Sequence, residues 1–168
     1  DAASGRYALG PLAMQMGLIS LQQLDPVALA TALIDELALD TGHTLAVAVW
    51  GNRGATIVRV AHPASPVHVS MRHGTVMSLR GTASGRLFAA HRPRAEVLAA
   101  LKAEAALDGR PKRQAALDAA FEADLARIRA DGISGVVGLS LPGVSALAAP
   151  VFDAGGLALS LTAIGPSE

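Results

Sequence analysis

The stretch His73-Gly-Thr-Val-Met-Ser-Leu-Arg-Gly-Thr-Ala-Ser-Gly-Arg-Leu-Phe-Ala-Ala90 decides how the rest of the chain is interpreted. In its first half, polar and apolar side chains alternate with the two-residue period of a strand. Thr82 can then cap a helix whose body, from Leu87 to Ala90, is apolar. The stretch therefore predicts a strand that runs directly into a helix.

The first turn of this predicted helix carries only small residues, Ala83, Ser84 and Gly85. Such side chains leave the unpaired backbone N–H groups of a helix start open, so a carboxylate or a hydroxyl can approach them. One interpretation is therefore an anion-binding pocket. The alternative is that Gly81 and Gly85 only allow the helix to pack closely on a sheet, and the residues alone leave both open.

The composition is that of one globular domain. The chain has 168 residues, which suffice for one core. Hydrophobic residues make up 51% of it and are mostly Ala, Leu and Val, and aromatic residues make up only 3% of the chain. Basic and acidic residues balance at 14 each, so the chain has no positive excess with which to grip a nucleic-acid backbone. The absence of Cys excludes disulfides and thiolate metal sites. No apolar run approaches the roughly 18 residues that span a bilayer, and we expect a cytoplasmic protein.

Hydrophobic periodicity predicts the other elements. The first is an amphipathic helix from Tyr7 to Ser20, which we interpret as a connector from a preceding domain or a dimer contact, with ordinary core packing as the alternative. The others are a helix from Asp25 to Gly42, strands 43–50, 55–62 and 67–71, helices that begin at Pro93 and Pro111, and strands 133–139, 144–152 and 157–164. The polar run 104–110 is typical of a loop, and we expect the charged face of the helix from Pro111 to be solvated.

These elements predict an α+β fold. Short turns between consecutive strands imply an antiparallel sheet, here of about six strands. We expect helices to cover one face of this sheet. The other face should partly enclose a cavity under the loop from Pro63 to Gly81.

Motifs for catalysis are weak. Ser84 lies in Gly-Thr-Ala-Ser-Gly, which lacks the frame of a nucleophile elbow, and the glycines between Gly132 and Gly138 lack the spacing and the following helix of a dinucleotide fingerprint. Acid–base catalysis usually requires two polar groups in an apolar cleft, whereas the segments expected to face the cavity offer mostly Val, Ala, Met, Leu, Ser and Thr. We therefore expect binding without catalysis, and no cofactor.

Three histidines, His62, His68 and His73, fall within twelve residues and could hold a metal with a carboxylate as fourth ligand. No paired ligand motif accompanies them. We favour the alternative that they lie on a loop-like strand edge without a metal.

Several segments of the chain resemble the motifs of one known family, in the same order and at similar spacing. They are Tyr7-Ala-Leu-Gly10, Leu29 to Gly42, Gly74-x5-Arg80-Gly-Thr-Ala-Ser-Gly-Arg86, Ile128-Arg-Ala-Asp-Gly132, Pro142-Gly-Val-Ser-Ala-Leu-Ala-Ala-Pro-Val-Phe-Asp153 and Leu159-Ser-Leu-Thr-Ala-Ile-Gly-Pro166. With these motifs the chain resembles the effector-binding domain of the IclR family of bacterial transcriptional regulators. The resemblance covers nearly the whole chain.

The resemblance implies a GAF-like fold that senses a small organic acid and self-associates as a dimer or tetramer. It implies that DNA is bound by an N-terminal winged helix-turn-helix domain, which this sequence does not contain. We accordingly expect residues 1–22 to be a linker helix from that missing domain and residues 23–168 to be the effector-binding domain.

The resemblance also implies a ligand site. It assigns the backbone amides of Ala83 and Ser84 to the carboxylate of the ligand, and a hydroxyl on the last strand to Thr162. Further predicted site residues line the pocket or lie on its strands; these are Val69, Met77, Val136, Val144, Ala146 and Ser160.

The chain departs from the family pattern at two places. Ile164 replaces a second hydroxyl, and residues 136–139 lack an acidic residue before the Pro142-Gly143 turn. Because an unpaired buried polar group costs about 1–3 kcal/mol, fewer polar partners favour a mostly apolar or aromatic acid over a small hydroxy-acid. The alternatives are a GAF-like enzyme, which requires a catalytic pair in the cavity, or a ligand-free dimerisation module, whose cavity is filled by side chains such as Trp50, Met71 and Met77.

Overall fold

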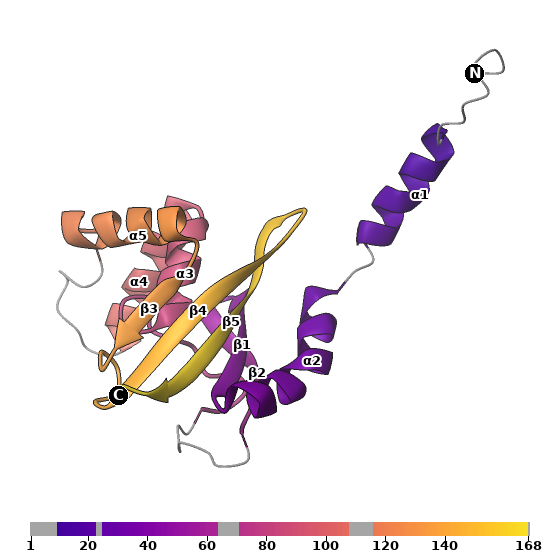
Figure 1. Ribbon diagram of the computed structural model, residues 1–168. Helices are drawn as coiled ribbons and strands as arrows, with labels where there is room; N and C mark the ends of the chain where they lie inside the picture. Colours follow the sequence, from indigo (N-terminus) through magenta and orange to yellow (C-terminus); the bar gives the residue numbers. More distant parts are fainter. Residues whose placement is uncertain (1–9, 23–24, 64–70, 108–115, 168) are drawn as a thin grey trace.

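The computed structural model describes residues 10–22, 25–63, 71–107 and 116–167. Ten elements follow one another along the chain (Figure 1). They are α1 (Pro11–Gln22), α2 (Pro26–Thr41), β1 (Thr44–Gly51), β2 (Gly54–Ala61), α3 (Ala83–His91), α4 (Arg94–Leu107), α5 (Ala119–Asp131), β3 (Ser134–Val137), β4 (Val144–Asp153) and β5 (Gly156–Pro166).

The five strands form one antiparallel sheet in the order β2-β1-β5-β4-β3, which confirms the predicted α+β class. Both predicted hairpins are present, with Gly51 paired to Gly54 and Asp153 paired to Gly156. The expected count of about six strands is one too high for the described residues. Most of the strand predicted at 67–71 lies outside the described residues.

The segment before α3 is not the strand that its alternating pattern predicts. It makes a single antiparallel bridge, between Val76 and Thr56 of the edge strand β2. Around this bridge the Ile57 N–H donates to the Thr75 carbonyl at 2.9 Å, and the Met77 N–H donates to the Ala55 carbonyl at 2.7 Å. From Leu79 the backbone turns, and the Thr82 N–H donates to the Ser78 carbonyl at 3.2 Å. The alternation therefore reflects one short contact with β2, followed by a turn that leads into α3.

The sheet carries helices on both faces, which corrects the expectation of one covered face. Figure 1 shows α2 on one side and α3, α4 and α5 on the other. The α2 side buries Ile34 and Ala38 against Leu45, Val47 and Leu159. Every residue of β1 from 44 to 48 is buried, because helices cover both faces of this strand. A strand in this position needs mostly apolar side chains at successive positions.

Helix α2 begins and ends where local signals predict. The Asp25 carboxylate accepts the N–H groups of Val27 and Ala28 at 2.9 and 3.2 Å, and Pro26 occupies the first helical position. At the other end Gly42 has a φ of 66°, the left-handed conformation that glycine adopts readily.

Helix α4 extends through residues 104–107, which the sequence pattern assigned to a loop. Ala105 is buried in this last turn. Residues 104–107 are Glu-Ala-Ala-Leu, residue types that favour a helix, and the hydrogen bonds of Glu104 and the burial of Ala105 stabilise this turn further.

Helix α5 begins after its N-cap Asp118, later than the prediction of a helix from Pro111, which lies outside the described residues. Leu117, predicted on its inner face, precedes it. The end at Asp131 and Gly132 is as predicted.

The charged face of α5 is not simply solvated, because basic residues of other elements pair with it. Arg80 donates to Asp118 at 2.9 Å and stacks its guanidinium 4.3 Å from the centre of the Phe121 ring. Two further ion pairs link the same face to α3 and α4; they are Arg86 with Asp124, and Arg94 with Glu122.

His91 at the end of α3 makes the stability of the fold pH-dependent. Burial lowers the pKa of its imidazole below 6.5, and the nearby Arg129 lowers it further. Between the lowered pKa and 6.5 the unfolded chain binds more protons, so the free energy of unfolding rises with pH. We expect the stability present above pH 6.5 to be lost as the pH falls towards the folded-state pKa. Urea unfolding across this range should show a flatter profile for His91→Gln, whereas the exposed control His73→Gln should follow the parent; identical profiles for all three would contradict the assignment.

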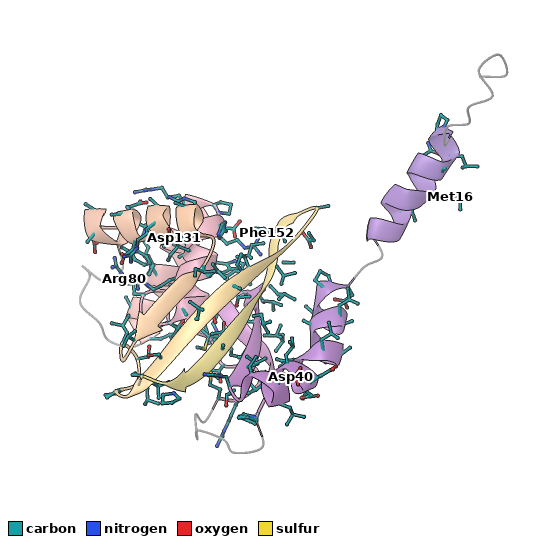
Figure 2. The ribbon with its side chains drawn as sticks, in the orientation of Figure 1. Met16, Asp40, Arg80, Asp131 and Phe152 are labelled. Carbon is teal, nitrogen blue, oxygen red and sulfur yellow. The ribbon has the colours of Figure 1, made fainter. Side chains whose placement is uncertain are left out.

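Helix α1 projects away from the sheet, as Figure 1 shows, with Met16 labelled on it in Figure 2. Three of its apolar side chains, Leu12, Met16 and Ile19, are 68, 63 and 55% exposed at spacings of four and three residues. These side chains are thus unburied in the single chain, so the alternative of ordinary core packing does not describe them.

Candidate functional site

A cavity of about 90 Å³ lies between the start of α3, the loop before α3, and the face of the sheet that α3 covers. It therefore lies on the side of the sheet that α3 covers, not on a helix-free face as expected. Seven of the nine predicted site residues line it, namely Met77, Ala83, Ser84, Val136, Val144, Ala146 and Thr162.

The start of α3 opens onto this cavity. Thr82 is its N-cap, and the Thr82 hydroxyl accepts the Gly85 N–H at 3.0 Å. Within the described part of the chain, the N–H groups of Ala83 and Ser84 have no protein acceptor. These two residues are only 1 and 2% exposed. Because buried donors are normally paired, this helix end is suited to an acceptor supplied by a ligand.

A buried hydroxyl pair links the start of α3 to the sheet wall of the cavity. The Ser84 and Thr162 hydroxyls lie 2.8 Å apart, within hydrogen-bond distance. One hydroxyl donates to the other, so a single O–H of the pair remains to donate elsewhere. Thr162 is paired across the sheet with Ala46 of β1 and Ala148 of β4, whose small side chains leave space beneath α3.

Two predicted site residues are not among those that line the cavity. Ser160 on β5 is fully buried, and its hydroxyl has no hydrogen-bond partner within the described residues. Val69 lies outside the described residues.

Sequence reasoning missed several lining residues: Ala46, Ile57, Gly81, Thr82, Ser140 and Leu141. The register of the sheet would have located Ala46 once Thr162 was chosen, because the two are direct cross-strand partners. Ser140 reaches the site by donating a hydrogen bond to the Gly81 carbonyl, a contact between residues far apart in the sequence.

Thr162→Val should destabilise the domain by about 1–3 kcal/mol, because it leaves the buried Ser84 hydroxyl without its partner. Ser160→Ala should cost less than about 1 kcal/mol or stabilise, because the deleted hydroxyl makes no hydrogen bond to the described residues. Urea unfolding of both variants measures the difference. Equal losses would contradict this account of the hydroxyls.

The cavity lining bears on the two alternatives to a binding site. No Asp, Glu, His, Lys or Arg is among the described residues that line the cavity, so these residues supply no acid–base pair. Met71 and Met77 line the cavity without filling it. Trp50 instead packs against Phe88, with ring centres 5.9 Å apart. The side chains named as possible fillers thus leave the cavity open among the described residues.

Neither His62 nor His73 is among the described residues that line the cavity. The His62 Nδ1 atom lies 3.3 Å from the Thr44 hydroxyl oxygen, within hydrogen-bond distance. His73 is exposed. His68 lies outside the described residues. Across residues 10–22, 25–63, 71–107 and 116–167, no group of three or more potential metal ligands comes together.

Comparison with known proteins identifies the family to which this fold belongs. The family model of the bacterial transcriptional regulator IclR C-terminal domain matches residues 19–165. The chain belongs to the IclR family. This IclR-family chain therefore corresponds to the C-terminal domain that the family model describes.

Solved structures and characterised relatives agree with this assignment. Pseudomonas aeruginosa HmgR is 41% identical, with a TM-score of 0.81 over 99% of this chain and 66% of HmgR. The glycerol operon regulatory protein of Streptomyces griseus is 31% identical over 169 residues, which cover all of this chain and 65% of that protein. Thermotoga maritima IclR, at 18% identity and a TM-score of 0.69, shares the fold.

This IclR-family domain thus spans just under two thirds of the length of the Streptomyces griseus regulator and of HmgR. Among the helices that the structure describes, none combines the length and apolar character needed to cross a bilayer.

Proposed function

We propose that this domain senses a small, mostly apolar or aromatic carboxylic acid, bound with its carboxylate at the N–H groups of Ala83 and Ser84. The observation that supports the proposal is that Ala83 and Ser84 are buried, line a largely apolar cavity, and have N–H groups with no acceptor among the described residues. The positive end of the α3 dipole favours a negative charge at this position. The remaining lining suits an apolar body of compact size.

The polar groups of the cavity set the selectivity. Besides the two N–H groups, the lining offers the hydroxyls of Thr82, Ser84, Ser140 and Thr162. Thr82 already bonds to the Ser78 carbonyl, Ser140 to Gly81, and Ser84 to Thr162. Additional hydroxyls on a ligand would therefore compete for few partners, and each unpaired one costs about 1–3 kcal/mol.

The domain would act without catalysis, as the sensor of a cytoplasmic regulator whose N-terminal winged helix-turn-helix domain binds DNA. Residues 1–22 would link the two, and the effector would bind one arrangement of the oligomer better than another. Support for a dimer or tetramer comes from exposed apolar surface on α1 and on a groove of about 480 Å³ between α2 and the β4–β5 hairpin. Size-exclusion chromatography with light scattering would reveal a monomer if this part is wrong.

Titration calorimetry with benzoate, glyoxylate and glycerol tests the proposed ligand class. Benzoate represents the aromatic acids, glyoxylate the small polar acids, and glycerol the compound in the name of the Streptomyces regulators. Benzoate should bind most tightly of the three. At a free benzoate concentration of 100 times its dissociation constant, binding should add about 2.7 kcal/mol to the free energy of unfolding. Tighter binding of glyoxylate or glycerol would overturn the proposed class, and no binding of any acid would overturn the acid site.

A further inference from the structure

We propose that Glu104 of α4 is a positioning residue for the effector site, because it holds the loop that orients the start of α3. The Ser78 hydroxyl donates to Glu104 Oε1 at 2.6 Å, and the Leu79 N–H donates to Glu104 Oε2 at 3.0 Å. Both carboxylate oxygens thus accept from two successive residues of the loop. The inference rests on the proposed acid site at Ala83 and Ser84.

A continuous set of hydrogen bonds runs from Glu104 to the helix start. The Ser78 hydroxyl that donates to Glu104 also accepts the Gly81 N–H at 3.0 Å. The Ser78 carbonyl accepts the Thr82 N–H at 3.2 Å and the Thr82 hydroxyl at 2.8 Å. Thr82 in turn accepts the Gly85 N–H at 3.0 Å. Ala83 and Ser84 lie between these two anchored residues, so the direction of their N–H groups depends on where Ser78 is held.

Packing and hydrogen bonds both hold this loop. Met77 lines the effector cavity and also a second hollow, of about 240 Å³, on the side towards α4. Arg53, Ser78, Glu104 and Leu107 line that second hollow. Leu79 is buried in the core and Gly85 packs closely on the backbone of residues 78 and 79, whereas Met77 has space on both sides. Directed hydrogen bonds therefore help to fix the part of the loop that packing leaves loose. Charge-assisted bonds to a carboxylate are the stronger kind, and Glu104 supplies two of them.

The experiment compares Glu104→Ala, Glu104→Gln and the matched control Glu96→Ala, which removes an exposed glutamate from the first turn of the same helix. The probe is benzoate, measured by calorimetry. Glu104→Ala should weaken benzoate binding at least about tenfold, because the site loses its preorganisation. Glu104→Gln keeps an acceptor for Leu79 and a group that can bond Ser78, so it should restore most of the affinity. Glu96→Ala should bind like the parent.

Amide spectra of the ligand-free domain give a readout that does not require benzoate to bind. The ¹H–¹⁵N resonances of Ala83 and Ser84 should move in Glu104→Ala and stay in place in Glu96→Ala. Ser78→Ala breaks the same link from the loop side with α4 intact, and it should move the same resonances if Glu104→Ala fails to fold. Unmoved Ala83 and Ser84 resonances in these variants would overturn the positioning role. Failure of the parent to bind benzoate would count against the proposed function only.

Discussion

Replacing Ala146 by leucine is expected to lower the affinity for benzoate by at least about tenfold, because the added carbons occupy the volume that the ligand needs. Ala146 lines the cavity from β4, between its cross-strand partners Val136 on β3 and Ile164 on β5. The cavity measures about 90 Å³, so three additional carbon atoms fill a large part of it. Titration calorimetry of the parent and the variant measures the loss.

The same substitution should not destabilise the domain, because it fills space that is empty in the free protein. Ala149→Leu is the matched control, since Ala149 lies on the same strand with its side chain exposed on the opposite face. This control should bind benzoate like the parent. Unchanged affinity in Ala146→Leu, or an equal loss in both variants, would place the ligand elsewhere.

Replacing Gly85 by alanine should destabilise the domain by about 3 kcal/mol or more, the upper range of overpacking. A methyl group at Gly85 would lie 2.1 Å from the Ser78 carbonyl oxygen and 2.8 Å from the Leu79 Cα. Both are backbone atoms, which cannot turn aside as a flexible side chain can. The glycine is thus required for close approach, as one interpretation of the sequence held, but the approach is to the loop before α3 and not to the sheet.

Urea unfolding of Gly85→Ala tests this expectation. Gly135→Ala is the control, because a methyl group there meets only the Leu147 side chain, at an ordinary contact distance of 3.6 Å. Loss of comparable size in the two variants would mean that the close approach at Gly85 is not what limits the substitution.

Local signals in the sequence predicted the elements that local interactions define. Asp25, Pro26 and Gly42 bound α2 through capping contacts within a few residues of the helix ends. Thr82 caps α3 in the same way, so the helix start at the centre of the site was predictable. The β4–β5 hairpin was predictable as well, because its short turn and two apolar strands are adjacent in the sequence.

Interactions between distant residues defeated the same reasoning. The polar character of residues 104–110 predicts a loop, although Asp108 and Arg110 come only after Leu107. Glu104 accepts two hydrogen bonds from residues 78 and 79, and α4 continues through it to Leu107. The sequence of α5 predicts that its charged face is solvated, because the partners of that face, such as Arg80, precede it by almost forty residues. Burial of β1 on both faces likewise depends on α2 and α3, which only the folded chain brings to opposite sides of the sheet.

The central claim is that the N–H groups of Ala83 and Ser84 receive the carboxylate of a bound acid. A ¹H–¹⁵N titration of the domain with benzoate tests it most directly, because each amide reports its own hydrogen bond. The account predicts that the Ala83 and Ser84 amide protons move downfield and saturate together with the calorimetric binding curve. Saturable binding that leaves both resonances in place would contradict it.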